Sequence, residues 1–185
     1  MTHTRRNFSF GLLAGAAALA GCGNGIGNTN DQRIDARVDD TLNFMTSRYP
    51  GTQSLRNNAS GVLVMPLITE AGLGFGGSYG RGALRVDDIT VDYYSAATAS
   101  AGFQIGAQQY AHVLFFMTEE ALLDFRRSPG WAAGADIEYA LQDQGQNIRA
   151  ETTTSLAPVI AAVFGQAGFR VGATLEGTKY SRIIP

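Results

Sequence analysis

Three glycines in the stretch AGLGFGGSYGRG, Ala71–Gly82, have the spacing of a phosphate-binding loop. Gly72, Gly74 and Gly77 satisfy G-x-G-x-x-G directly after the apolar run Gly61–Pro66, an order typical of a dinucleotide site. Such a loop must turn sharply and open a helix whose N-terminus meets the phosphate. The chain instead continues as SYGRGALRV, which has no helical stripe. We therefore expect no nucleotide and no other cofactor here.

The glycine pattern occurs three times, which favours a structural role. The copies are AGLGFGG (Ala71–Gly77), AGFQIGA (Ala101–Ala107) and AGFRVGA (Ala167–Ala173). Strand alternation places the second and sixth residues of each copy, which are glycines, on one face and the larger apolar residues on the other. Glycine within a strand marks sharp bending or the close approach of another element. We predict a β-dominated α+β fold, with a strongly curved, barrel-like antiparallel sheet and a few helices.

Residues able to carry out catalysis or hold a metal are scarce. Cys22 is the one cysteine, and His3 and His112 are the two histidines. A Ser-His-Asp arrangement would have to use His112, which stands in the apolar run YAHVLFFM and is better explained as a core histidine. The acidic pairs Asp87-Asp88 and Glu119-Glu120 fit a turn and a helix start. We expect no catalytic residue, no metal and no enzyme activity.

The first 21 residues have the layout of an export signal. Arg5 and Arg6 precede a short apolar segment from about Phe8 to Gly21, too short for an ordinary transmembrane helix. TRRNF has the form of a twin-arginine signal. LAGC, ending in Cys22, has the form of a lipobox, in which the cysteine is acylated and becomes the mature N-terminus. The alternative is a plain secretory signal with an incidental cysteine.

The segment that follows predicts a lipid-anchored protein with an acidic domain. Residues 22–30 form the acylated N-terminus and a flexible Gly/Asn tether. Because Gly23 rather than Asp follows the cysteine, we expect the periplasmic side of a Gram-negative outer membrane. Without Arg5 and Arg6, the 14 basic residues fall to 12 against 16 acidic ones, so the net charge is −4. No polybasic run exists, and we expect no nucleic-acid partner.

Residues 31–185 are expected to form one domain that begins with a helix over 31–48. Its apolar stripe is Ile34, Val38, Leu42 and Met45. The acidic polar face favours packing on the core over a position on a membrane surface. A second helix is predicted from Glu119, with Thr118 as N-cap, up to Ser128. Strands are predicted at SGVLVMP, ITVDYYSA, YAHVLFFM, AAGADIEYAL, APVIAAVFG and AGFRVGATLEG.

Several ordered motifs from about Leu42 to Ile183 resemble the SYLF domain, the Ysc84-like family of lipid-binding and actin-regulating proteins, in its bacterial lipoprotein branch. The motifs are GVLVMP, the glycine-rich strand, FQIGAQ, FFMTEEAL, GWAAGAD and LEGTK. The resemblance implies a non-enzymatic domain that contacts membrane lipid, with anionic phospholipid as a possible ligand. Actin is not carried over, because an exported protein would not meet it. The alternative is an envelope scaffold that binds a protein partner and touches lipid only through its anchor.

Six residues are candidates for contact with lipid head groups. Arg81 and Arg85 follow the glycine strand on the same side as Tyr79, but also fit as surface charges at a strand end. Arg126 and Arg127 could bind phosphate beside an interfacial Trp131; alternatively, the arginines complement a helix C-terminus and the indole belongs to the core. Lys179 is a further cation near the end of the chain.

Overall fold

The computed structural model describes residues 29–134, 137–139, 157–165, 168–169 and 175–185. Its helices are α2 (Asn30–Arg48), α3 (Thr52–Asn58) and α4 (Glu119–Arg127). Its strands are β1 (Gly61–Val86), β2 (Ile89–Phe116), β3 (Trp131–Ala132), β4 (Ile137–Tyr139), β5 (Val159–Gly165), β6 (Gly168–Phe169) and β7 (Lys179–Ile183).

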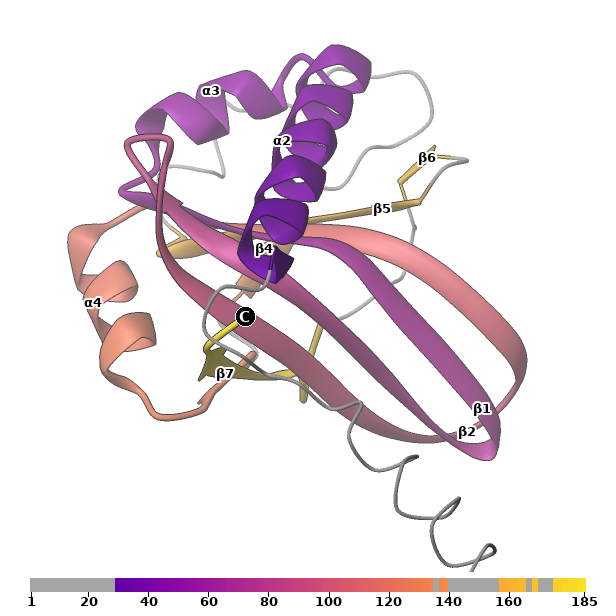
Figure 1. Cartoon of the computed structure of the whole chain (residues 1–185). Helices are drawn as coiled ribbons and strands as arrows, with labels where there is room; N and C mark the ends of the chain where they lie inside the picture. The colour runs from indigo at the N-terminus through magenta and orange to yellow at the C-terminus, as the bar shows by residue number, and fades with distance from the viewer. Residues whose placement is uncertain (1–28, 135–136, 140–156, 166–167, 170–174) are drawn as a thin grey trace, which may run out of the picture. The chain divides into compact units, whose positions relative to one another are not determined.

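A long bent hairpin of β1 and β2 is the centre of the fold (Figure 1). The two strands pair antiparallel along their length, from Val86 opposite Ile89 to Gly61 opposite Phe116. Three of the runs predicted as separate strands, SGVLVMP, ITVDYYSA and YAHVLFFM, are therefore parts of these two continuous strands. The first two glycine motifs face each other in the register, with Gly72 opposite Gly106. The third motif lies almost wholly outside the described residues, apart from β6.

Glycine lets the two halves of β1 cross in contact. A Cβ at Gly82 would overlap the carbonyl oxygen of Val64, and one at Gly80 would overlap that of Leu67. Backbone therefore packs on backbone, which a larger residue would prevent. The strands curl into a half-barrel, so the prediction of a strongly curved antiparallel sheet with glycine-rich strands is confirmed.

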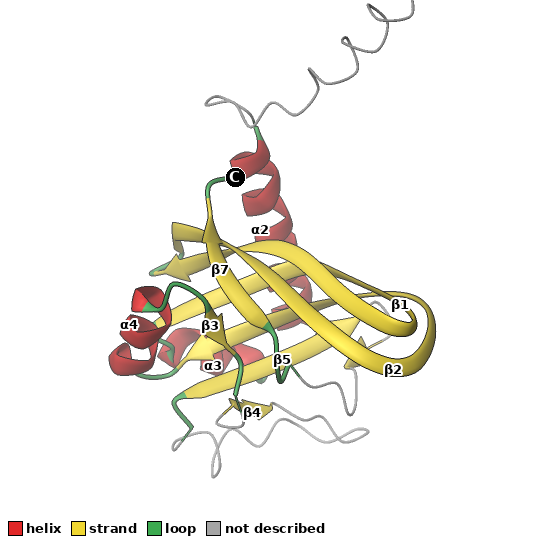
Figure 2. Cartoon of the chain, turned by 90° about the horizontal axis from the view of Figure 1, so that it is seen from below, coloured by secondary structure: helices red, strands yellow, loops and turns green. Residues whose placement is uncertain are grey.

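The remaining strands extend the sheet from the second edge of β2. β7 pairs with β2 over Tyr93–Ala97, and β5 pairs with it over Ala111–Phe116. β3 continues the sheet beyond β7, while β4 lies parallel to β5 (Figure 2). Two separate groups of strands are thus held on one long central strand, and its bend brings them face to face.

Helix α2 covers one side of the sheet, as its stripe predicts. Ile34, Val38, Leu42 and Met45 are all buried, at 0–7 % exposure. They pack in a cluster with residues of β1, β2 and β5, among them Val64, Ala83, Val113, Phe115 and Ile160. The stripe is occupied by the protein's own core, which bears out core packing and excludes its use on a membrane surface in this fold.

Helix α4 closes the opposite side of the sheet (Figure 1). Thr118 caps it as predicted, its hydroxyl accepting a hydrogen bond from the amide of Ala121. Leu122 and Phe125 point into a second cluster that includes Leu63, Leu84 and Leu114. Helix α3 was not predicted; its apolar signal consists of Leu55 alone within seven residues.

Residues 31–185 form one compact unit by their internal contacts. Within the described residues, no helix combines the length and apolar character needed to cross a membrane.

Candidate functional site

The face of the sheet next to the start of α2 carries two cations and an exposed tyrosine. We call it the outer face and define it by Tyr79, Arg81, Ser95, Ala97, Lys179 and Ser181. One row across the three strands consists of Tyr79, Ala97 and Lys179, which lie opposite one another in the register. Two residues further along each strand, Arg81, Ser95 and Ser181 form a second row. Residues directly opposite each other in antiparallel strands point to the same side.

Small side chains separate the charged ones on the outer face. Tyr79 is 55 % exposed, and Arg81, Ala97 and Lys179 are also exposed. Neither Arg81 nor Lys179 forms an ion pair with any residue that the structure describes. Strand spacing puts their Cα atoms about 12 Å apart. Phosphate groups can bind these two cations without displacing an ion-pair partner among the described residues.

The stem of Lys179 lies over the turn that follows α4. A Cβ at Gly130 would stand 2.6 Å from Lys179 Cε and 3.3 Å from its Nζ. The lysine therefore covers backbone with its methylene groups while its ammonium stays accessible. The register thus brings two of the six candidates, Arg81 and Lys179, onto one face.

Arg85, in contrast, forms ion pairs with two aspartates of α2. Its Nη2 lies 2.8 Å from Asp39 Oδ1 and 3.7 Å from Asp35 Oδ1, and its Nη1 donates to the carbonyl oxygen of Asp88 at 2.9 Å. The side chain is 14 % exposed. A lipid phosphate would have to displace two carboxylates to reach it, so Arg85 is a poor lipid ligand in this conformation.

Polar contacts continue along the first turns of α2. Asp35 accepts hydrogen bonds from Thr90 Oγ1 at 2.8 Å and from the Tyr93 hydroxyl at 2.9 Å. Burial, followed by the hydrogen bond to Asp35, raises the pKa of Tyr93 to about 12. Tyr93 therefore stays a hydrogen-bond donor across the physiological range, and the helix start remains fixed to β2.

The arginines of α4 stand apart from the outer face cations. Arg126 Nε lies 3.2 Å from Asp92 Oδ2, and Arg182 Nε lies 3.3 Å from the other oxygen of the same carboxylate. Arg182 also donates to the carbonyl oxygen of Arg126 at 3.2 Å, near the helix C-terminus. Arg127 is exposed. Arg126 is thus partly neutralised, and sequence spacing gave no sign of its bridge through Asp92.

Trp131 packs with the aromatic core rather than standing out from it. Its ring centroid lies 5.4 Å from that of Phe125, 5.7 Å from Tyr180 and 6.4 Å from Phe116. It is partly buried against the same cluster. This arrangement matches the core alternative for the indole.

His112 is deep in the core, 1 % exposed. Its Nε2 lies 2.8 Å from the Tyr180 hydroxyl, and burial lowers the pKa of His112 to about 3. The ring is neutral at physiological pH and lies out of reach of an external substrate. Among the described residues, no three His, Cys, Asp or Glu side chains gather as metal ligands would.

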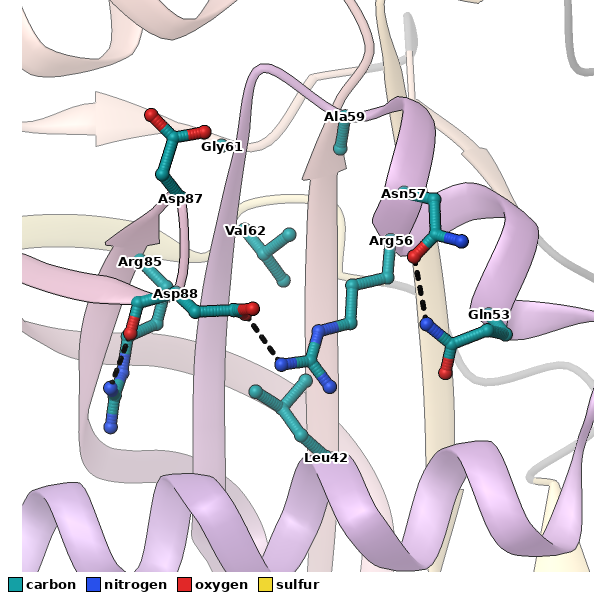
Figure 3. Close-up of a pocket in the computed structure, with 10 residues that line it drawn as sticks. All are labelled: Leu42, Gln53, Arg56, Asn57, Ala59, Gly61, Val62, Arg85, Asp87 and Asp88. Atoms are coloured by element: carbon teal, nitrogen blue, oxygen red, sulfur yellow. Dashed lines mark hydrogen bonds and ion pairs between the residues drawn. The ribbon is translucent and has the colours of Figure 1, made fainter.

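A pocket of about 350 Å³ lies between α2, α3 and the β1–β2 turn (Figure 3). Its charged side chains include Arg56, which is paired with Asp88, and Arg85, paired as described above. Gln53 Nε2 donates to Asn57 Oδ1 at 2.8 Å. Both arginines of this pocket already have carboxylate partners, so it is less suited than the outer face to bind an anion.

Three predicted residues of the export and lipidation segment, Arg5, Arg6 and Cys22, lie outside the described residues. The side chains of the glycine motif at Ala101–Ala107 do as well. Sequence reasoning did not identify Ser95, Ala97 and Ser181 as neighbours of the cations. These three residues lie beside the cations because β2 pairs with both β1 and β7. The register between strands that are distant in the chain cannot be read from a local sequence pattern.

A comparison with known families found a match. The model described as "Ysc84: Las17-binding protein actin regulator" matches residues 97–182, which runs from within β2 to the end region of β7 and includes Ala97, Lys179 and Ser181 of the outer face. A search of curated proteins found no match.

Proposed function

The chain belongs to the Ysc84 family over residues 97–182, and from this premise we propose that its folded domain binds membrane lipid without catalysing a reaction. Family membership supports a lipid-binding or actin-regulating type of domain. Actin is a cytoplasmic protein, so a protein exported by its first 21 residues would not meet it. Of the two ligands of the family, only lipid would then be accessible to this domain.

The observation that carries the proposal is the outer face. Arg81 and Lys179 project from neighbouring rows of the sheet, without ion pairs to described residues, and Tyr79 is more than half exposed beside them. Cations near an anionic lipid surface contribute about 1 kcal/mol each. Tyrosine suits the boundary between head groups and acyl chains, because its ring is apolar and its hydroxyl is polar. The domain would therefore bind anionic lipid weakly and reversibly.

Durable attachment would come from Cys22. We propose that the protein is exported through Arg5 and Arg6, acylated at Cys22 and held in the outer membrane with its domain in the periplasm. Two or more acyl chains give lasting membrane attachment where one does not. With such an anchor, the domain needs only weak affinity of its own.

Vesicle flotation tests whether the domain itself binds lipid. Residues 22–185 with Cys22→Ser would be mixed with vesicles of phosphatidylcholine alone or with added phosphatidylglycerol. We expect flotation that requires phosphatidylglycerol and declines with salt, because exposed charges are screened. Absence of flotation with both compositions would instead favour an envelope scaffold that binds a protein partner.

A further inference from the structure

The start of α2 lies beside the outer face. Asp35, one turn into the helix, is bonded to Tyr93, and Tyr93 points to the same side of β2 as Ser95 and Ala97. Two residues along a strand span about 6.8 Å, so Ala97 is about 14 Å from Tyr93 along β2. Ile183, near the end of the chain, pairs with Tyr93 as well, and Figure 2 shows the C-terminus next to the beginning of α2.

The chain between Cys22 and Asn30 is short. Eight residues, 22–29, precede the helix. A fully extended chain of this length reaches about 28 Å, and a flexible Gly-rich one has a root-mean-square span of about 16 Å. A tether of this span would hold the start of α2 within about 28 Å of acylated Cys22. It also limits the domain to the surface of the membrane that holds Cys22.

Charge favours the outer face over the helix as the surface nearest that membrane. The start of α2 keeps a net negative charge, since Asp35 and Asp39 share the single cation Arg85. The outer face has Arg81 and Lys179 available, and its small residues let a flat surface approach. A tether of this length also raises the effective concentration of lipid to the millimolar range or above, so weak contacts suffice.

We propose that the outer face lies against the same membrane that anchors Cys22, rather than reaching a second membrane or facing the periplasm. This inference rests on the proposed lipid anchor. It assigns the tether a second task, which is to orient the domain as well as to retain it. Tyr79, Ala97 and Lys179 would stand at the level of the lipid head groups.

The chain provides a clean way to test the orientation. Cys22 is the sole cysteine and is consumed by acylation in the proposed mature protein. Ala97→Cys would then introduce one free thiol on the outer face, for an environment-sensitive fluorophore. Glu120→Cys, exposed on α4, is the matched control. The full mature lipoprotein would be placed in vesicles of phosphatidylcholine and phosphatidylglycerol, with iodide in solution and a quencher carried on lipid tails.

We expect the probe at position 97 to lose most of its quenching by iodide and to gain quenching from the lipid, while the probe at 120 stays accessible to iodide. Equal iodide quenching at both positions would overturn the proposal. So would clustering of the protein-bearing vesicles with protein-free acceptor vesicles, or a mature protein whose mass shows no acylation. Protection at position 97 together with no flotation of the Cys22→Ser chain would support the orientation and reject independent lipid affinity.

Discussion

Gly82 and Val64 are eighteen residues apart on the same strand, yet their backbones are in contact because β1 crosses itself. A Cβ at position 82 would overlap the Val64 carbonyl oxygen and stand 2.7 Å from Met65 Sδ. Neither backbone can withdraw easily, since both halves of β1 are paired with β2. The glycine-rich stretch thus has a geometric role at this crossing.

We therefore expect Gly82→Ala to lower the free energy of unfolding by about 3 kcal/mol, at the upper end of the range for overpacking a well-packed core. Urea denaturation would measure the change. Gly134→Ala is the control, because a Cβ there meets nothing within 4 Å. Equal stability of the two variants would show that β1 does not need glycine to cross itself.

The burial of His112 predicts a loss of stability in acid. Its pKa is about 3 in the fold against 6.5 when exposed. The unfolded chain therefore takes up a proton below pH 6.5 while the folded chain does not. The contribution is fully present above pH 6.5 and declines as pH falls toward 3, by about 1.4 kcal/mol per pH unit.

At pH 5 this amounts to about 2 kcal/mol relative to pH 7. His112→Gln keeps a polar side chain near Tyr180 but has no proton to gain. Urea denaturation of both proteins at pH 7 and pH 5 should show a smaller loss for the variant. Parallel pH profiles for wild type and His112→Gln would contradict a neutral, buried imidazole.

The β1–β2 turn holds two aspartates with left-handed backbone conformations. Asp87 has φ 50° and Asp88 has φ 64°, as a two-residue hairpin turn requires. Asp88 also pairs with Arg56, but the Asp88 side chain is 73 % exposed and the pair is worth about 1 kcal/mol at most. Backbone conformation should therefore dominate the effect of substitution here.

Asp88→Gly and Asp88→Ala separate the two effects, because both remove the partner of Arg56 and only alanine opposes a positive φ. We expect Asp88→Ala to be less stable than Asp88→Gly by about 1 kcal/mol. Thermal unfolding of the two variants would measure the difference. Equal midpoints would mean that the turn changes its conformation freely.

Local patterns predicted those elements whose signals lie within a few residues. The stripe from Ile34 to Met45 and the cap at Thr118 correspond to α2 and α4. The continuous length of β1 was missed, since Pro66 and the glycines interrupt the apolar runs that mark a strand. Helix α3 was missed because one apolar residue in seven makes no stripe.

The candidate site depended far more on contacts between distant segments. Arg81 and Arg85 look alike in sequence, four residues apart on one strand. Only the packing of α2 pairs Arg85 with Asp39 and leaves Arg81 exposed. Likewise, Lys179 joins Arg81 on one face because β2 pairs with both β1 and β7. Side-chain type can suggest such cations, but their grouping follows from the register.

The export signal makes a prediction that does not depend on the fold. If Arg5 and Arg6 direct export through the twin-arginine route, then Arg5→Lys with Arg6→Lys should trap the precursor inside the cell, although the charge is unchanged. Cell fractionation and the size of the accumulated chain would measure this. Normal export of the double variant would assign the segment to the ordinary secretory route.

The outer face makes the sharpest prediction for lipid binding. Arg81→Ala with Lys179→Ala removes two cations that have no ion pair among the described residues, so we expect little change in unfolding free energy. At about 1 kcal/mol for each cation, binding to vesicles with phosphatidylglycerol should weaken by about 30-fold. Arg37→Ala with Arg48→Ala removes the same charge from exposed positions on α2 and is the matched control.

Flotation of the two double variants at low salt distinguishes two possibilities. Lipid either contacts Arg81 and Lys179 directly or is attracted to the positive charges of the protein wherever they lie. The outer face accounts for binding if only the Arg81 and Lys179 variant loses affinity, and if raising the salt concentration narrows the gap between the variants. Equal losses would mean that lipid senses only the net charge, which would remove Arg81 and Lys179 as the binding residues. A loss confined to the α2 variant would move the lipid contact to the helix.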